Sequence, residues 1–85
     1  MKYSVDWAPD AESELAEIWV NQPDERRNIS MAQNQIDRLL TRDPLGYSSM
    51  LSEGLYAIVV QPLRIIFEVS NTEMSVRVVS AKWFP

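Results

Sequence analysis

The side chains that most often perform acid–base or nucleophilic chemistry are missing from this sequence. It contains no histidine and no cysteine, which excludes histidine-dependent triads, thiol nucleophiles, disulfides and cysteine-based zinc sites. Carboxylates, lysines and arginines remain as candidates for chemistry. Twelve acidic residues against eight basic ones give a net charge of −4 and a pI near 4.6. We therefore expect no autonomous binding to nucleic acid, whose phosphates attract basic surfaces.

The acidic residues are concentrated near the start of the chain, in the series Asp10, Glu12, Glu14 and Glu17. They alternate with an apolar stripe at helical spacing, made of Ala11, Leu15, Ile18 and Trp19. Such acids could hold a metal ion or a basic partner, but acids outside the apolar stripe of a helix more often form its solvated face. We predict no metal site and no cofactor.

The helices that carry these charges follow from the same periodicity. Pro9 is well placed at the first position of a helix, and a second helix is expected from about Asp24 to Thr41, ended by Asp43-Pro44. The short connection between them predicts an antiparallel hairpin. Trp7 and Trp19 are expected to pack in the core. The arginines of the second helix are expected to pair locally or to cover apolar surface.

The remaining segments read as strands. Residues 2–7 alternate polar and apolar side chains, and residues 55–60, 63–70 and 74–81 are rich in Val, Ile, Tyr and Phe. Residues 44–54 are expected to be a loop with at most one short extended stretch. At 46% hydrophobic and 24% charged residues, the composition is that of a globular protein. The sequence predicts one α+β domain over residues 1–85: an N-terminal strand, an antiparallel helical hairpin and three antiparallel strands, with the helices packed on one face of the sheet.

Two expected hairpins assign the side chains to faces of this sheet. A turn at Gln61-Pro62 pairs Val60 with Leu63, and a two-residue turn at Asn71-Thr72 pairs Ser70 with Glu73. The core face is then Tyr56, Ile58, Val60, Leu63, Ile65, Phe67, Val69, Met74, Val76 and Val78. The second face is Leu55, Ala57, Val59, Ile66, Val79 and Ala81, with Arg64, Arg77 and Glu68 among them. A solvated face is usually polar, so we expect a partner to cover this one. Arg64 could also pair with Glu68.

Four segments carry a family resemblance: "YSVDWAPDAESELAEIW" opens the chain, "RDPLG" closes the hairpin, and "GLYAIVVQPLRIIFEV" leads into "SVRVVSAKWF". In this order and at this spacing, the chain resembles the RelE/ParE superfamily of type II toxin–antitoxin toxins over essentially its whole length. The resemblance implies a toxin whose antitoxin covers parts of the sheet and of the hairpin. One branch of that family cleaves messenger RNA on the ribosome, and another inhibits DNA gyrase without nuclease chemistry.

The resemblance also assigns candidate site residues. Arg64 matches the family's central-strand arginine, which would contact a phosphate and stabilise developing charge. Lys82 falls in the basic stretch after the last strand, and Glu53, just ahead of the first of the three strands, is the nearby carboxylate that could act as a base. These three are the candidate catalytic residues. The candidate partner-binding residues are Leu55, Ala57, Val59, Ile66, Arg77, Val79, Trp83 and Phe84.

Several of these positions depart from the nuclease pattern. Ala57 and Val59 stand where some family nucleases carry lysines, and Trp83 and Phe84 stand where a histidine–tyrosine pair or an arginine would act. Neither aromatic residue can transfer a proton. The preferred function is therefore a toxin that acts by binding protein, with an antitoxin as partner and gyrase or the ribosome as target. A ribosome-dependent endoribonuclease and an inactive, homodimeric toxin-fold module remain as alternatives. We expect a cytoplasmic protein with no membrane-spanning segment.

Overall fold

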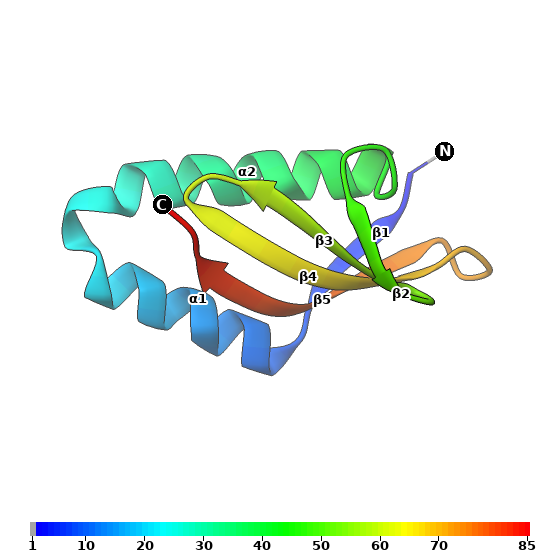
Figure 1. Cartoon of the computed structure of the whole chain (residues 1–85), viewed down its shortest axis with the longest axis horizontal. Coiled ribbons are helices and arrows are strands. Elements are labelled where there is room, and N and C mark those ends of the chain that lie inside the picture. Colours follow the sequence, from blue (N-terminus) through cyan, green and yellow to red (C-terminus); the bar gives the residue numbers. More distant parts are fainter. Residues whose placement is uncertain (1) are drawn as a thin grey trace.

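Two amphipathic helices form one layer of the computed structural model, which describes residues 2–85. Helix α1 spans Pro9–Asn21 and helix α2 spans Arg26–Arg42, joined by a short 3-10 helix, η1, over Pro23–Glu25 (Figure 1). The first turn of α1 contains a proline and two acids, as the positive end of a helix dipole favours. Neither helix of the described residues has the length and apolarity that crossing a bilayer requires.

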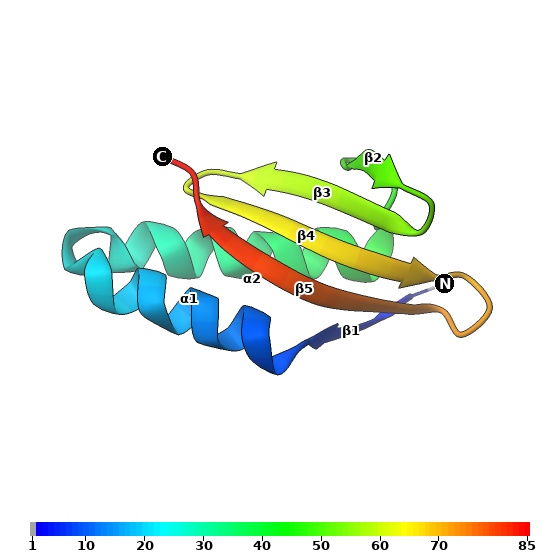
Figure 2. The ribbon, with the colours of Figure 1, turned by 60° about the horizontal axis from the view of Figure 1, so that its bottom comes forward.

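The second layer is a five-stranded sheet with the strand order β1-β5-β4-β3-β2. Its strands are β1 (Ser4–Trp7), β2 (Ser49–Ser52), β3 (Leu55–Val60), β4 (Leu63–Ser70) and β5 (Ser75–Trp83). Strand β1 runs parallel to β5, and the other neighbours are antiparallel. Figure 2 shows both helices on one side of this sheet. The predicted α+β architecture is confirmed, and the short stretch expected within residues 44–54 is the edge strand β2.

The core lies between the two layers. Ile29, Ile36 and Leu40 of α2 are fully buried in one cluster with Phe67 of β4 and Val78 of β5, which are also inaccessible to solvent. The core-facing residues predicted for β3 and β4 are confirmed, since each belongs to this cluster or packs against it: Tyr56, Ile58, Val60, Leu63, Ile65, Phe67 and Val69. A sheet face buried under two helices needs this continuous apolar surface.

The two tryptophans expected in the core have different environments. Trp7 is half-buried against the core, and its Nε1 donates a hydrogen bond to Asp37 Oδ1 at 3.1 Å. Trp19 is 38% exposed, so its predicted core position is wrong. Instead, the Arg26 guanidinium lies 5.5 Å from the Trp19 ring centroid, and Arg26 Nε donates to the Trp19 carbonyl oxygen at 3.0 Å. Arg26 therefore covers the Trp19 ring, which does not pack in the core.

The register of the β3–β4 hairpin is as predicted, with Val60 opposite Leu63 and Val59 opposite Arg64. The predicted register of β4 and β5 is wrong. The connection spans residues 71–74, with Met74 in a left-handed conformation at φ 52°, rather than a two-residue turn. Met74 therefore lies in the loop and not on the core face of a strand. Phe67 pairs with Val78, two positions beyond the expected partner.

A β-bulge in β5 then changes which residues share a face. The pairing passes from Phe67–Val78 to Ile66–Ser80, which leaves Val79 without an opposite residue. Because an extra residue shifts the alternation by one, Ala81 turns into the core and is 1% exposed. Its predicted place on the second face is wrong, and Ser80 and Lys82 take that face instead. The doublet Val78-Val79 interrupts the alternation of apolar residues and is the sequence signal of this bulge.

Candidate functional site

The sheet face away from the helices is built from three rows of side chains that cross β3, β4 and β5. In register order the rows are Val59–Arg64–Lys82, Ala57–Ile66–Ser80 and Leu55–Glu68–Arg77. We call these nine residues the open face. Strand β3 contributes apolar side chains, of which Val59 is 45% exposed, whereas β5 contributes polar ones. The face is thus apolar on one side and charged on the other, rather than the continuous apolar patch that the sequence predicted.

Arg64 occupies the central strand of the open face and is half-buried. Its guanidinium forms no hydrogen bond or ion pair with any residue between positions 2 and 85. The alternative pairing with Glu68 is not formed. Arg77 instead lies 3.8 Å from Asp6, Nη1 to Oδ2, in an exposed pair that contributes little to stability. The five donors of Arg64 therefore remain available to an anionic ligand.

Lys82, directly opposite Arg64, is held by Glu14 of α1. The Lys82 ammonium contacts Glu14 Oε2, and the backbone N–H of Ala81 donates to Glu14 Oε1 at 3.1 Å. This contact forms because β1 pairs only with Ser75–Val78 of β5, so the edge of β5 beyond Val78 is left for α1 to cover. The hydrogen bond from Lys82 is the main cause that holds the pKa of Glu14 below its usual value. The sequence assigned Glu14 to a solvated helix face and contained no signal for this distant contact.

The third candidate catalytic residue, Glu53, does not lie beside Arg64 and Lys82. Glu53 lies exposed in the turn between β2 and β3, beside the row that contains Leu55. Leu55 and Val59 are separated along β3 by about 13 Å, at roughly 3.3 Å per residue. Glu53 therefore lies at the opposite end of the open face from Arg64 and Lys82, and the predicted trio is split.

Of the two aromatic candidates at the end of the chain, Trp83 lies apart from the open face. Trp83 pairs with Leu63 and packs against the core from the helix side. The backbone N–H of Phe84 donates to the Pro62 carbonyl oxygen at 2.7 Å, and Phe84 is 44% exposed. These contacts hold the last residues against the β3–β4 turn.

The helical hairpin, the parallel β1–β5 pair and the antiparallel strands after it define an α+β fold found in solved toxin structures. No protein-family model matches the chain, and no curated protein matches it. A chain of the toxin–antitoxin complex RelBE2 from Mycobacterium tuberculosis is similar at a TM-score of 0.81 and 16% identity, over 98% of this chain and 99% of that one. A chain of the chromosomal ParDE TA system from P. aeruginosa is similar at a TM-score of 0.77 and 14% identity, over 98% of this chain and 97% of that one.

The isolated RelE toxin from E. coli is similar at a TM-score of 0.69 and 15% identity, over 98% of this chain and 85% of that one. The likeness thus extends over nearly the whole chain in each comparison. The chain has the RelE/ParE-type toxin fold.

Proposed function

We propose that this chain is the toxin component of a type II toxin–antitoxin pair and is neutralised by an antitoxin protein. The observation that carries the proposal is the full-length similarity, at a TM-score of 0.81, to a chain of a toxin–antitoxin complex. The open face adds support because its apolar β3 side, including Leu55 and Val59, has no helix over it in the part of the chain that the structure describes.

The toxin acts by binding a protein target, gyrase or the ribosome, rather than by nuclease chemistry. Attack by a ribose 2′-hydroxyl needs a group that accepts a proton and one that donates it, and each such group typically contributes about 10²–10⁴-fold. Beside Arg64 the titratable neighbours are Lys82 and, through it, Glu14. A lowered pKa makes the Glu14 carboxylate a weak base. Glu53 is too far along the sheet to serve, and Trp83 and Phe84 cannot transfer protons.

A growth assay tests the proposal. Expression of this chain alone in bacteria should slow growth, and co-expression of the small neighbouring reading frame should restore it. An early-stop version of the gene, expressed at the same transcript level, is the control. Normal growth at a verified protein level would contradict the toxin function but leave the fold assignment unaffected.

Ribosome-dependent cleavage of messenger RNA is the second candidate, favoured by one observation. Arg64 and Lys82 are direct cross-strand neighbours, and two adjacent cations could stabilise a pentacovalent phosphate. Toeprinting on translating ribosomes would then show cleavage in the A site that Arg64→Ala abolishes. Intact transcripts in growth-arrested cells would remove this candidate and leave protein binding as the mode of action.

A further inference from the structure

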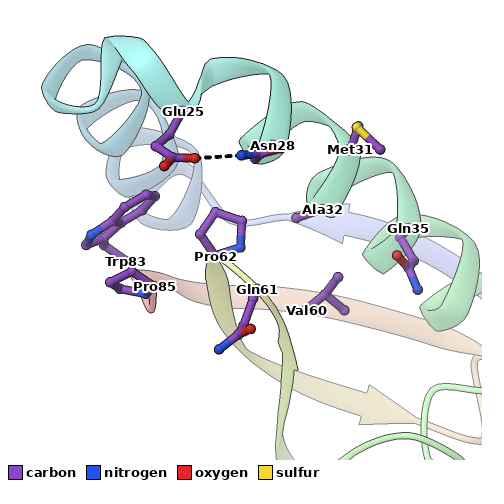
Figure 3. Close-up of a pocket in the computed structure, with 10 residues that line it drawn as sticks. All are labelled: Glu25, Asn28, Met31, Ala32, Gln35, Val60, Gln61, Pro62, Trp83 and Pro85. Atoms are coloured by element: carbon purple, nitrogen blue, oxygen red, sulfur yellow. Dashed lines mark hydrogen bonds between the residues drawn. The ribbon is translucent and has the colours of Figure 1, made fainter.

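A groove on the helix side of the molecule lies between α2, the β3–β4 turn and the last residues of the chain. Its volume is about 390 Å³, near the lower end for sites that hold a small molecule or a single large side chain. Figure 3 shows the Glu25 carboxylate, the Trp83 indole and the Pro62 ring gathered at one end, with Met31 and Gln35 toward the other. The groove is separate from the open face, because Trp83 lies on the opposite side of the sheet from Lys82.

The groove combines an aromatic surface with an acidic group. Glu25 Oε2 accepts a hydrogen bond from Asn28 Nδ2 at 2.7 Å, whereas Glu25 Oε1 has no partner within residues 2–85. Apolar surface comes from Val60, Pro62 and Met31, and the other polar lining groups are neutral amides. No lysine or arginine lines the groove. A cation that entered would therefore meet a carboxylate and an aromatic ring, with no positive charge to oppose it.

Backbone contacts fix the strand end and the turn that carry two of the lining residues, Trp83 and Pro62. Trp83 is the last residue of β5 and stands opposite Leu63 in the ladder. The hydrogen bond from Phe84 N to Pro62 O then ties the following residue to the β3–β4 turn. The proline ring is thus held by the backbone, and the Trp83 indole packs against the core, which lowers the entropy lost on binding.

We propose that this groove binds an arginine side chain presented by the neutralising partner protein. A guanidinium is planar, stacks on aromatic rings and pairs with carboxylates, whereas its aliphatic stem suits the apolar lining. The chain already contains one contact of this kind, in which Arg26 stacks over Trp19. The net charge of −4 favours a basic partner segment in addition. The inference rests on the proposed function only in naming the partner as the antitoxin.

Titration of the isolated, ¹⁵N-labelled chain with N-acetyl-arginine methylamide tests the groove itself. We expect saturable shifts of the Trp83 indole N–H and of the amides of Glu25, Asn28 and Gln61. The citrulline analogue has nearly the same shape without the charge, and it should bind about fivefold more weakly. Glu25→Gln should weaken arginine binding by roughly threefold. Glu17→Gln removes the same charge from an exposed position on α1 and should leave the affinity unchanged.

Three results would overturn the inference: shifts that do not saturate, equal affinity for arginine and citrulline, or shifts centred on Trp19 instead of Trp83. Preserved amide dispersion in Glu25→Gln shows that any loss of binding is not a loss of folding. The growth assay is independent of this titration. Growth arrest without arginine binding would contradict only the proposal that the groove binds arginine. Arginine binding without growth arrest would contradict only the proposed toxin function.

Discussion

At the scale of single residues, Glu14 connects the helical layer to the charged side of the open face. Its carboxylate accepts hydrogen bonds from the Ala81 backbone and from Lys82, across 67 and 68 positions of sequence. Both contacts involve the part of β5 that β1 does not cover. Glu14 thereby satisfies an edge amide and neutralises the cation next to Arg64.

Replacing Glu14 by Gln should lower the free energy of unfolding by about 1 kcal/mol at neutral pH. The folded-state pKa of Glu14 is depressed. The Glu14 carboxylate therefore stabilises the fold at pH values above its unfolded-state pKa, and this stabilisation is lost as the pH falls through the folded-state pKa. The difference between the wild type and Glu14→Gln, measured by urea unfolding, should therefore be largest near pH 7 and shrink in acid. Glu17→Gln removes an exposed carboxylate from the same helix and is the control at pH 7, where it should change the free energy of unfolding by less than about 0.5 kcal/mol.

Arg64 lies on the central strand of the open face, in an end row, and no residue between positions 2 and 85 uses its donors. Arg64→Ala should abolish growth inhibition while changing the free energy of unfolding by less than about 1 kcal/mol. Urea unfolding and the growth assay measure the two effects separately. Arg38→Ala, which removes an exposed arginine of α2, should leave growth inhibition intact. Full toxicity of Arg64→Ala would exclude this guanidinium from target contact.

At the scale of elements, the bulge in β5 decides the composition of both sheet faces. The regular ladder predicted from the sequence would place Ala81 on the second face, whereas the bulge buries it. Ala81→Asp should thus lower the free energy of unfolding by roughly 3 kcal/mol or more, since it places an unpaired charge in the core. Ser80→Asp, on the open face next to Ile66, should cost less than about 1 kcal/mol. The reverse order of the two effects in urea unfolding would support the regular ladder.

Strand β3 supplies the apolar side of the open face, and its exposed residues are the best candidates for antitoxin contact. Val59→Ser should weaken binding of the protein encoded by the neighbouring reading frame by about tenfold, measured by titration calorimetry. Stability should change little, because Val59 is already about half exposed. Leu45→Ser alters another exposed apolar residue, in the turn after α2, and should bind normally. Equal affinities for both variants would place the antitoxin elsewhere.

At the scale of the whole molecule, a short chain depends on one core formed by both helices and three of the strands. Chains of 85 residues bury a smaller fraction of their surface than larger domains do, so their stability is modest. A partner that binds only the folded form adds about 4 kcal/mol when it is present at a thousandfold excess over its Kd.

The complex with the antitoxin should therefore unfold at a temperature higher by roughly 10 °C or more than the isolated chain. Differential scanning calorimetry of both samples, at several partner concentrations, measures this shift. A melting temperature that does not depend on partner concentration would contradict neutralisation by binding.

Size measurement of the isolated chain checks the homodimer alternative, in which Ile66→Asp should convert a dimer to a monomer.

The sequence by itself determined both helices, the β3–β4 hairpin and the face on which Arg64 lies. These features follow from periods of 3.6 and 2 residues and from proline positions, all of which are local. It also determined which chemistry is absent, since composition does not depend on the fold. Tyr56 and Phe67 illustrate the success, because their predicted pairing places the two rings 5.9 Å apart.

Only the tertiary structure decided the parallel pairing of β1 with β5 and the contact of Glu14 with Lys82. Each joins groups that are far apart in the chain, so no local pattern specifies it. The bulge at Val79 has a local signal in the doublet Val78-Val79, but its effect is tertiary: a single extra residue reverses every side chain after it, and Ala81 then packs into the core. The groove proposed to bind arginine is likewise formed by segments distant in sequence, namely α2, the β3–β4 turn and Trp83.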